Sequence, residues 1–194
     1  MVDDLSPTTD LHEKKLHGTV AYEGSFLRVQ RDSVSLPDGK TATREYIKHP
    51  GAVVIIPVLD DGKVLLEKQF RYPLGKVFIE FPAGKIDIGE DPLDCAKREL
   101  REETGYTALD WQHLCTIHNA IAYSDEHLEI YIARGLREGF KSLDDGEFLE
   151  TFTATPKQMM EWVRQGDITD VKTVIGTFWL EKILSNQWCS NSMK

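Results

Sequence analysis

The chain lacks features that would each point to a definite class of protein. Among its 194 residues are only three cysteines, none paired as CxxC, so we expect neither a disulfide framework nor a structural zinc site. No apolar stretch approaches membrane-spanning length. The N-terminal segment MVDDLSPTTDLHEKK also lacks the apolar core of a signal peptide. We therefore expect a cytoplasmic protein without a membrane partner.

Positive charge is also scarce. Lys and Arg number 23 against 32 Asp and Glu, which gives a formal net charge of −9. A protein held on nucleic acid by bulk electrostatics needs a cationic face, so we expect no nucleic-acid partner. The 41% apolar and 28% charged residues are typical of a folded chain, with room for one domain and a small appendage.

Turn signals divide the chain near residue 50. Residues 1–15 are polar and without periodicity, which predicts a frayed arm. Residues 19–47 predict short strands separated by turns. The tripeptide HPG then interrupts the pattern. We therefore expect an N-terminal β segment over residues 1–50 and a larger domain over residues 51–194.

The larger domain mixes strands with helices. The run AVVIIPVL predicts a strand buried on both faces, and the turn DDG predicts a hairpin into KVLLEKQF. A helix is expected where Asp91 can cap the first turn, Pro92 suits the first helical position and Gly105 can stop the last. The expected helices cover residues 91–104, 156–164 and 170–185. The fold class is therefore α/β.

Three glutamates follow the edge of the apolar stripe of the first helix. At about 100° per residue, Glu103 lies beside the stripe, with Glu99 and then Glu102 beyond it, and the helical wheel places no Lys or Arg between them. Carboxylates so close together repel one another, and Mg²⁺ favours carboxylate, carbonyl and water oxygens. The helix therefore predicts either a metal site or a solvated acidic face.

The surrounding residues resemble a known pattern. Gly84, then Glu90 after five residues, then RELREETGY after seven more, resemble a complete Nudix box. The preceding FPAG and the upstream QFR resemble the ADP-ribose pyrophosphatase branch of the Nudix hydrolases. The resemblance implies a Nudix α/β/α sandwich with a mixed sheet, preceded by a small N-terminal antiparallel β domain that mediates a swapped homodimer.

The resemblance also implies the metal ligands. Glu99 and Glu103 would be the principal ligands of Mg²⁺, for which Mn²⁺ could substitute. Glu102 would hold a further metal or its waters, and the Ala83 carbonyl would complete the first site.

Residues on either side of the helix receive supporting roles by the same resemblance. Glu90 and Arg98 would brace the preceding loop against the helix. A general base or an added metal ligand is expected in the downstream loop LDDGE, where Glu147 is the first candidate and Asp145 the second. The alternative for this loop is a solvated acidic turn.

Substrate contacts are expected outside the box. Arg71 resembles an arginine that grips the phosphates in this branch, although it could be an ordinary cation at a strand end. Glu80 could reach a ribose hydroxyl or serve as a buried structural carboxylate. Arg44 and His49 could reach substrate across a dimer.

One departure concerns the substrate. The ADP-ribose branch is often marked by a proline about sixteen residues past the box, and here the segment NAIAYSDE has none. Ser124 and Glu126 in this segment could shape the pocket for the terminal ribose or for another sugar.

The implied function is Mg²⁺-dependent hydrolysis of the diphosphate of ADP-ribose or a related nucleoside diphosphate sugar, giving a nucleoside monophosphate and a sugar phosphate. The alternatives are a catalytically silent nucleotide-sugar sensor, or a pyrophosphatase for GDP-mannose, NADH or an oxidised deoxynucleoside triphosphate.

Overall fold

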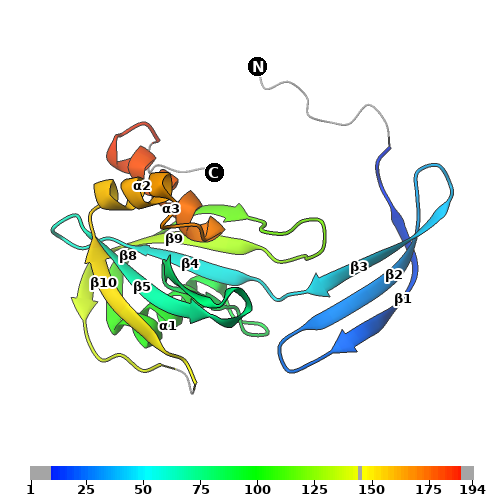
Figure 1. Ribbon diagram of the computed structural model, residues 1–194, viewed down its shortest axis with the longest axis horizontal. Coiled ribbons are helices and arrows are strands. Elements are labelled where there is room, and N and C mark those ends of the chain that lie inside the picture. Colours follow the sequence, from blue (N-terminus) through cyan, green and yellow to red (C-terminus); the bar gives the residue numbers. More distant parts are fainter. Residues whose placement is uncertain (1–9, 144–145, 189–194) are drawn as a thin grey trace. The chain divides into compact units, whose positions relative to one another are not determined.

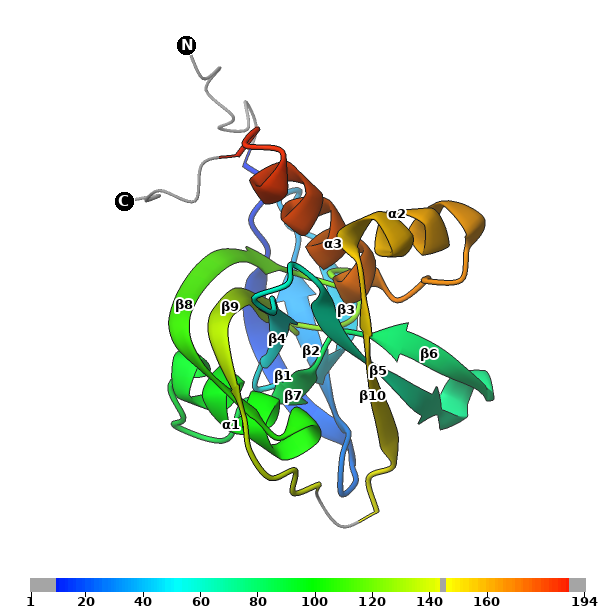
Figure 2. The same cartoon turned by 90° about the vertical axis from the view of Figure 1, so that its left-hand side faces the viewer.

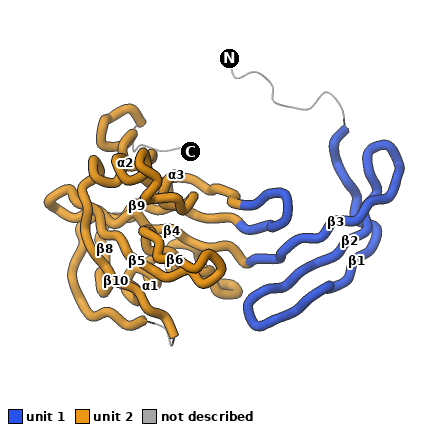
Figure 3. The backbone as a smooth tube through the Cα atoms, viewed as in Figure 1, with its two compact units in different colours: residues 1–49, 120–126 blue, residues 50–119, 127–194 orange. Residues whose placement is uncertain are grey.

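The computed structural model describes residues 10–143 and 146–188, and they form two compact units (Figure 3). The units part after His49, one residue before the expected boundary. The first unit also takes in Ala120–Glu126, for which no sequence signal was recognised. Backbone bonds explain this, because the Ile47 N–H donates to the Tyr123 carbonyl at 2.9 Å and the Asp125 N–H to the Ile47 carbonyl at 3.2 Å.

The first unit is built on an antiparallel sheet in the order β1-β2-β3 (Figure 1). Its strands are β1 (Lys14–Glu23), β2 (Arg28–Ser35) and β3 (Thr41–Lys48). The expectation of an unstructured arm to residue 15 is therefore wrong at its end, because β1 already pairs with β2 at Lys14. The expected N-terminal antiparallel β segment is present.

The second unit has three layers. Its sheets have the orders β7-β4-β9-β8 and β10-β5-β6, and the parallel pairing of β4 with β9 makes the first sheet mixed. Helix α1 packs on one side of the sheets and helices α2 and α3 on the other (Figure 2). The elements are β4 (Ala52–Pro57), β5 (Val64–Arg71), the 3₁₀ turn Tyr72–Leu74, β6 (Lys76–Glu80), β7 (Ala83–Lys85), α1 (Pro92–Thr104), β8 (Tyr106–Ile117), β9 (Leu128–Glu138), β10 (Leu149–Ala154), α2 (Pro156–Gln165) and α3 (Val171–Leu184).

Strand β4 is buried on both faces, as its β-branched run predicts. Val54 and Ile56 pack in the core that includes residues of α2 and α3, whereas Val53 and Ile55 pack in the core against α1. All four side chains are fully buried, and each such burial stabilises the fold by roughly 1.5–3 kcal/mol. This strand therefore joins the two helical layers.

The expectation of a hairpin between β4 and β5 is wrong. The turn itself forms, since the Leu59 N–H donates to the Lys63 carbonyl at 2.9 Å. Beyond it the strands share only the isolated bridge between Val58 and Val64, and they enter different sheets. Strand β4 ends at Pro57, which has no amide hydrogen for a ladder, and its edges are already taken by β7 and β9.

Helix α1 begins and ends where the sequence predicts. The Asp91 carboxylate accepts hydrogen bonds from the amides of Leu93 and Asp94 at 2.9 and 3.4 Å, and Pro92 occupies the first turn. Gly105 stops the helix with a φ of 79°, which a residue without Cβ adopts readily. No helix in the described part of the chain is long and apolar enough to cross a membrane.

Candidate active site

The C-terminal half of α1 carries its acidic edge against the loop that ends β6. Glu103 is 2% exposed, and its Oε2 accepts a hydrogen bond from the Ala83 N–H at 3.0 Å. The Glu99 side chain is 13% exposed and that of Glu102 is 22% exposed. The expected alternative of a fully solvated acidic face therefore does not fit α1.

Gly84 lets the Glu99 carboxylate approach the backbone. A Cβ atom at this position would lie 1.9 Å from Glu99 Oε1 and 1.9 Å from its Cδ, far inside van der Waals contact. A residue with any side chain here would displace the carboxylate. The glycine of the PAG sequence thus has a steric role in the site.

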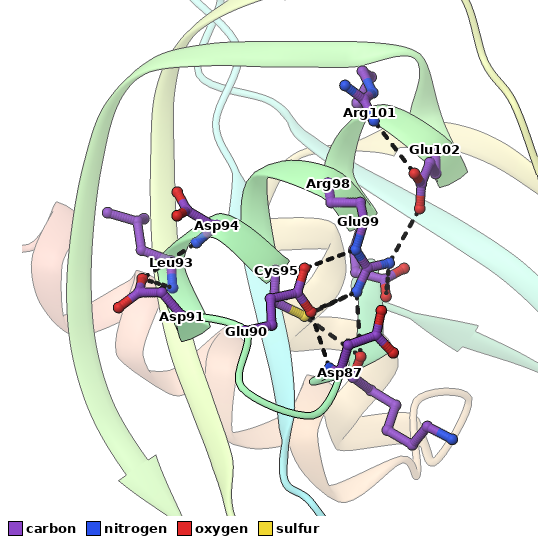
Figure 4. A network of polar contacts seen from close by, with 11 residues as sticks. Asp87, Glu90, Asp91, Leu93, Asp94, Cys95, Arg98, Glu99, Arg101 and Glu102 are labelled. Carbon is purple, nitrogen blue, oxygen red and sulfur yellow. Dashed lines mark hydrogen bonds and ion pairs between the residues drawn. The ribbon is translucent and has the colours of Figure 1, made fainter.

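Arg98 binds three carboxylates (Figure 4). Its Nε and Nη2 donate to the two oxygens of Glu90 at 2.9 Å each, which is the expected brace. Its Nη1 donates to Glu99 at 2.7 Å and to Glu102 at 3.1 Å. The expectation that no cation lies among the glutamates is therefore wrong, because a wheel ignores the length of an arginine side chain.

These contacts and the burial of α1 shift several pKa values. The Arg98 guanidinium lowers the pKa of Glu90 to about 2. Burial raises the pKa of Glu99 to about 7 against the opposing effect of Arg98. Burial also raises the pKa of Glu103 well above its usual range, and the charges of Glu67, Glu99 and Glu147 add to the rise. In water-poor surroundings these acids resist carrying negative charge together.

Cys95 lies beside this network. Its thiol is buried, 3.3 Å from Arg98 Nη2 and 3.5 Å from the Lys85 carbonyl oxygen. Burial raises its pKa to about 12, so the thiol stays protonated at neutral pH. Since the thiolate is the nucleophile, Cys95 serves packing.

Glu67 on β5 is a carboxylate that the sequence reasoning missed. It is fully buried, and within the described residues neither of its oxygens has a hydrogen-bond partner. Burial, together with the charge of Glu80, raises its pKa to about 8. The available signal was an acid inside the apolar run VLLEKQF.

A second polar group joins β5, β6 and the start of α3. Arg71 donates from Nε and Nη2 to the Glu80 carboxylate at 2.7 and 2.8 Å. Lys172 also bonds Glu80, and it contacts Asp170 at 3.0 Å. Burial raises the pKa of Glu80, but the bonds from Arg71 and Lys172 outweigh it and hold that pKa below its ordinary value. This geometry favours the structural interpretation of Glu80. The two bonds to Glu80 use Nε and Nη2 of Arg71 and do not use its Nη1.

The acidic loop downstream is tied to β5. Glu147 Oε1 accepts a hydrogen bond from Gln69 Nε2 at 3.3 Å, two residues along the strand from Glu67. The charge of Glu147 also acts on both Glu67 and Glu103. The second candidate of this loop, Asp145, lies outside the described residues.

The other expected substrate contacts belong to the first unit. Arg44 donates from Nε to Glu13 Oε2 at 2.9 Å and makes a second bond to the same carboxylate. The Ser124 hydroxyl accepts from the Glu126 N–H at 3.1 Å. These residues are therefore not brought to the α1 glutamates within one unit.

The oxygens around α1 suit a hard divalent cation. The donors are the carboxylates of Glu99, Glu102 and Glu103, ligands that Mg²⁺ and related ions prefer, and the Glu67 oxygens, which have no hydrogen-bond partner among the described residues, have the same chemistry. Among the described residues no three His, Cys, Asp or Glu side chains are already gathered as a metal site. Glu99 and Glu102 instead bond Arg98.

Two family models match the chain. Residues 48–172 match the NUDIX domain, and residues 13–47 match the nucleoside diphosphate sugar hydrolase N-terminal domain. The first match covers the strands of the second unit and α1, and the second match covers the N-terminal sheet.

Two similar proteins come from bacilli. A protein of Bacillus methanolicus named methanol dehydrogenase activator is 36% identical over 171 residues, which cover 87% of this chain and 92% of that protein. An ADP-ribose pyrophosphatase of Bacillus subtilis (strain 168) is 36% identical over 173 residues, which cover 88% of this chain and 94% of that enzyme.

A solved structure confirms the fold. The crystal structure of an ADP compounds hydrolase superposes with a TM-score of 0.82 at 23% identity, covering 94% of this chain and 98% of that chain. The expected α/β/α sandwich with an N-terminal β unit is thereby confirmed.

Proposed function

Because the chain belongs to the Nudix hydrolase family, we propose that it hydrolyses the diphosphate bond of ADP-ribose or a related nucleoside diphosphate sugar with the help of Mg²⁺. From ADP-ribose the products are AMP and ribose 5-phosphate. The substrate class is carried by one observation, the match of residues 13–47 to the N-terminal domain of nucleoside diphosphate sugar hydrolases. The name of the Bacillus subtilis relative supports it.

Nudix hydrolases generally use divalent metal ions, and the specific proposal is Mg²⁺ with Mn²⁺ as a substitute. Glu99, Glu103 and the Ala83 carbonyl would hold the first ion, and Glu102 a further ion or its waters. When bound, such an ion neutralises charge on the phosphate oxygens and lowers the pKa of a coordinated water.

The other acidic residues act on proton transfer and orientation. Glu147 takes a proton from the attacking water or adds a ligand, and its bond from Gln69 supports a fixed orientation. Asp145 is the second candidate for this role. Glu90 keeps Arg98 against the helix, and loss of such a partner loosens the groups that it orients.

Substrate binding is proposed for residues outside the box. Arg71 offers the phosphates a planar fork of donors, and its pairing with Glu80 supports a fixed direction for that fork. Glu80 itself would act through Arg71. Arg44 would reach the substrate across the dimer, and Ser124 and Glu126 would shape the pocket for the terminal ribose or another sugar.

We further propose a cytoplasmic homodimer in which residues 1–50 mediate dimerisation and residues 51–194 carry catalysis. Strand β1 supports this assignment, because its apolar side chains Leu16, Val20 and Tyr22 are 55%, 40% and 57% exposed. A second chain would cover such a surface. The described cysteines are free thiols, in keeping with a reducing compartment.

A panel of substrates tests the activity. The purified chain would be supplied with Mg²⁺ and, in turn, with ADP-ribose, GDP-mannose, NADH, a dinucleoside polyphosphate and an oxidised deoxynucleoside triphosphate. We expect the highest kcat/KM for ADP-ribose or another nucleoside diphosphate sugar. Preference for the triphosphate would overturn the substrate class, and binding of ADP-ribose without turnover of any compound would favour the silent sensor.

A further inference from the structure

Glu67 stands in an unusual position for a carboxylate. Its neighbour Leu66 packs in the apolar core between the sheets and α2 and α3, and the alternation of a strand turns Glu67 to the opposite face, where Gln69 also lies. Glu67 is fully buried, and its two oxygens have no hydrogen-bond partner among the described residues. Burial of a charged carboxylate without partners is strongly unfavourable, so the group at this position must either stay protonated or meet a compensating positive charge.

The charged groups around Glu67 do not provide that compensation directly. Antiparallel pairing of β5 with β6 sets Glu67 opposite Glu80, and like charges in such a pair repel. The two cations that act on Glu67 are Arg71 and Lys172, and both bond to Glu80. These two cations equal Glu67 and Glu80 in number, but within the described residues neither of them hydrogen-bonds Glu67.

The geometry relates the same side chain to the acidic edge of α1, because Glu103 accepts a hydrogen bond from the Ala83 N–H, three residues beyond Glu80, the strand partner of Glu67. Beyond the effect of burial, the charge of Glu67 raises the pKa of Glu103, and the charge of Glu147 raises the pKa of both. Gln69, on the same face of β5 as Glu67, holds Glu147. Strand β5 thus adds a buried carboxylate to the glutamates of the helix.

We propose that Glu67 is a ligand of a divalent metal ion that it shares with Glu103. The inference rests on the metal use proposed above and adds to it a ligand from β5, outside the box motif. A doubly charged ion between the two carboxylates would offset their mutual repulsion and give the Glu67 oxygens a partner. A merely structural acid at this position would need no ion.

Mn²⁺ binding to the full-length protein tests the proposal. Glu67→Gln keeps the shape of the side chain but removes its charge, and Glu67→Leu suits a buried position in case glutamine does not fold. Glu150→Gln is the matched control, because Glu150 is exposed on the neighbouring strand β10 and pairs with Lys68 on the opposite face. Affinity would be measured by isothermal titration calorimetry, and folding by thermal unfolding in EDTA.

We expect the Glu67 variants to bind Mn²⁺ at least ~10-fold more weakly, with an unfolding temperature in EDTA equal to or above that of the wild type, and the control to bind normally. Wild-type affinity in a folded Glu67 variant would overturn this inference alone and leave the proposed function standing. Failure of the wild-type protein to bind Mn²⁺ would overturn both.

Discussion

At the residue scale, Gly84 shows how the site depends on a missing side chain. Gly84→Ala would push the Glu99 carboxylate away from the backbone, so we expect kcat/KM to fall by about 10–100-fold while the free energy of unfolding changes by less than ~1 kcal/mol. Steady-state kinetics and urea unfolding would measure the two effects.

Gly62→Ala is the matched control for Gly84→Ala. Gly62 has a φ of 79° and open space around its missing side chain, so alanine should cost stability, by about 1 kcal/mol, and leave the kinetics unchanged. Equal activity of Gly84→Ala and the wild type would contradict the steric role of Gly84.

The buried acids predict how metal-free stability depends on pH. The pKa values of Glu67 and Glu99 in the folded protein are about 8 and about 7 against an ordinary value of 4.5, and that of Glu103 is raised as well. The folded state therefore holds more protons than the unfolded chain between pH 4.5 and 8, so stability is lost as pH rises. The lowered pKa of Glu90, about 2, has no effect in this window.

Urea unfolding in EDTA at pH 5.5 and pH 8 measures this loss. We expect the free energy of unfolding to fall by roughly 2–5 kcal/mol between the two values, and the fall to be smaller in Glu67→Gln. Stability that is constant or rises over this interval would show that the pKa values of these carboxyls are not raised in the folded protein.

At the element scale, Arg98 ties the loop before α1 to the helix through the paired bonds to Glu90. A lysine has one point charge where the guanidinium has a fork, so Arg98→Lys should lose nearly as much activity as Arg98→Ala, about 10–100-fold in kcat/KM. Kinetics on both variants decide this. Lys97→Ala on the same helix, where the side chain pairs only with Asp94 among the described contacts, should keep full activity. Wild-type kcat/KM in Arg98→Lys would contradict the need for the guanidinium fork.

The sequence predicts correctly those helices and strands that depend on residues close together in the chain. The bounds of helix α1 are predicted by Asp91, Pro92 and Gly105. The burial of β4 on both faces is predicted by its unbroken β-branched run. The prediction of a β4–β5 hairpin is wrong because β4 pairs instead with β7 and β9, which lie far along the chain. A turn signal specifies the turn and leaves the pairing beyond it open.

The candidate site divides in the same way. The alignment of the α1 glutamates along one edge follows from helical spacing, whereas the contact of Glu90 with Arg98 follows from the resemblance of the box. The bond of Lys172 to Glu80 joins residues 92 positions apart, and the lack of a hydrogen-bond partner for Glu67 among the described residues arises only after β6 and β10 have paired with β5. Such features require tertiary structure, so no spacing rule could have found them.

At the scale of the whole molecule, the exposed apolar side chains of β1 predict self-association. Light scattering after size-exclusion chromatography should give the mass of two chains for the wild type and of one chain for a variant with Val20→Glu and Tyr22→Glu, because buried charge opposes an apolar interface. Lys40→Ala, at an exposed turn of the same unit, should remain dimeric. A wild-type monomer at micromolar concentration would contradict the proposed assembly.

The acidic edge of α1 is proposed to drive hydrolysis of a diphosphate. The most direct measurement follows ADP-ribose by ³¹P NMR with Mg²⁺, with EDTA, and with Mg²⁺ and the variant Glu103→Gln, whose fold is checked by circular dichroism. We predict that AMP and ribose 5-phosphate appear only with the wild type and Mg²⁺, and that folded Glu103→Gln loses at least ~10²-fold in rate. Near-normal turnover by that folded variant, or in EDTA, would contradict the account.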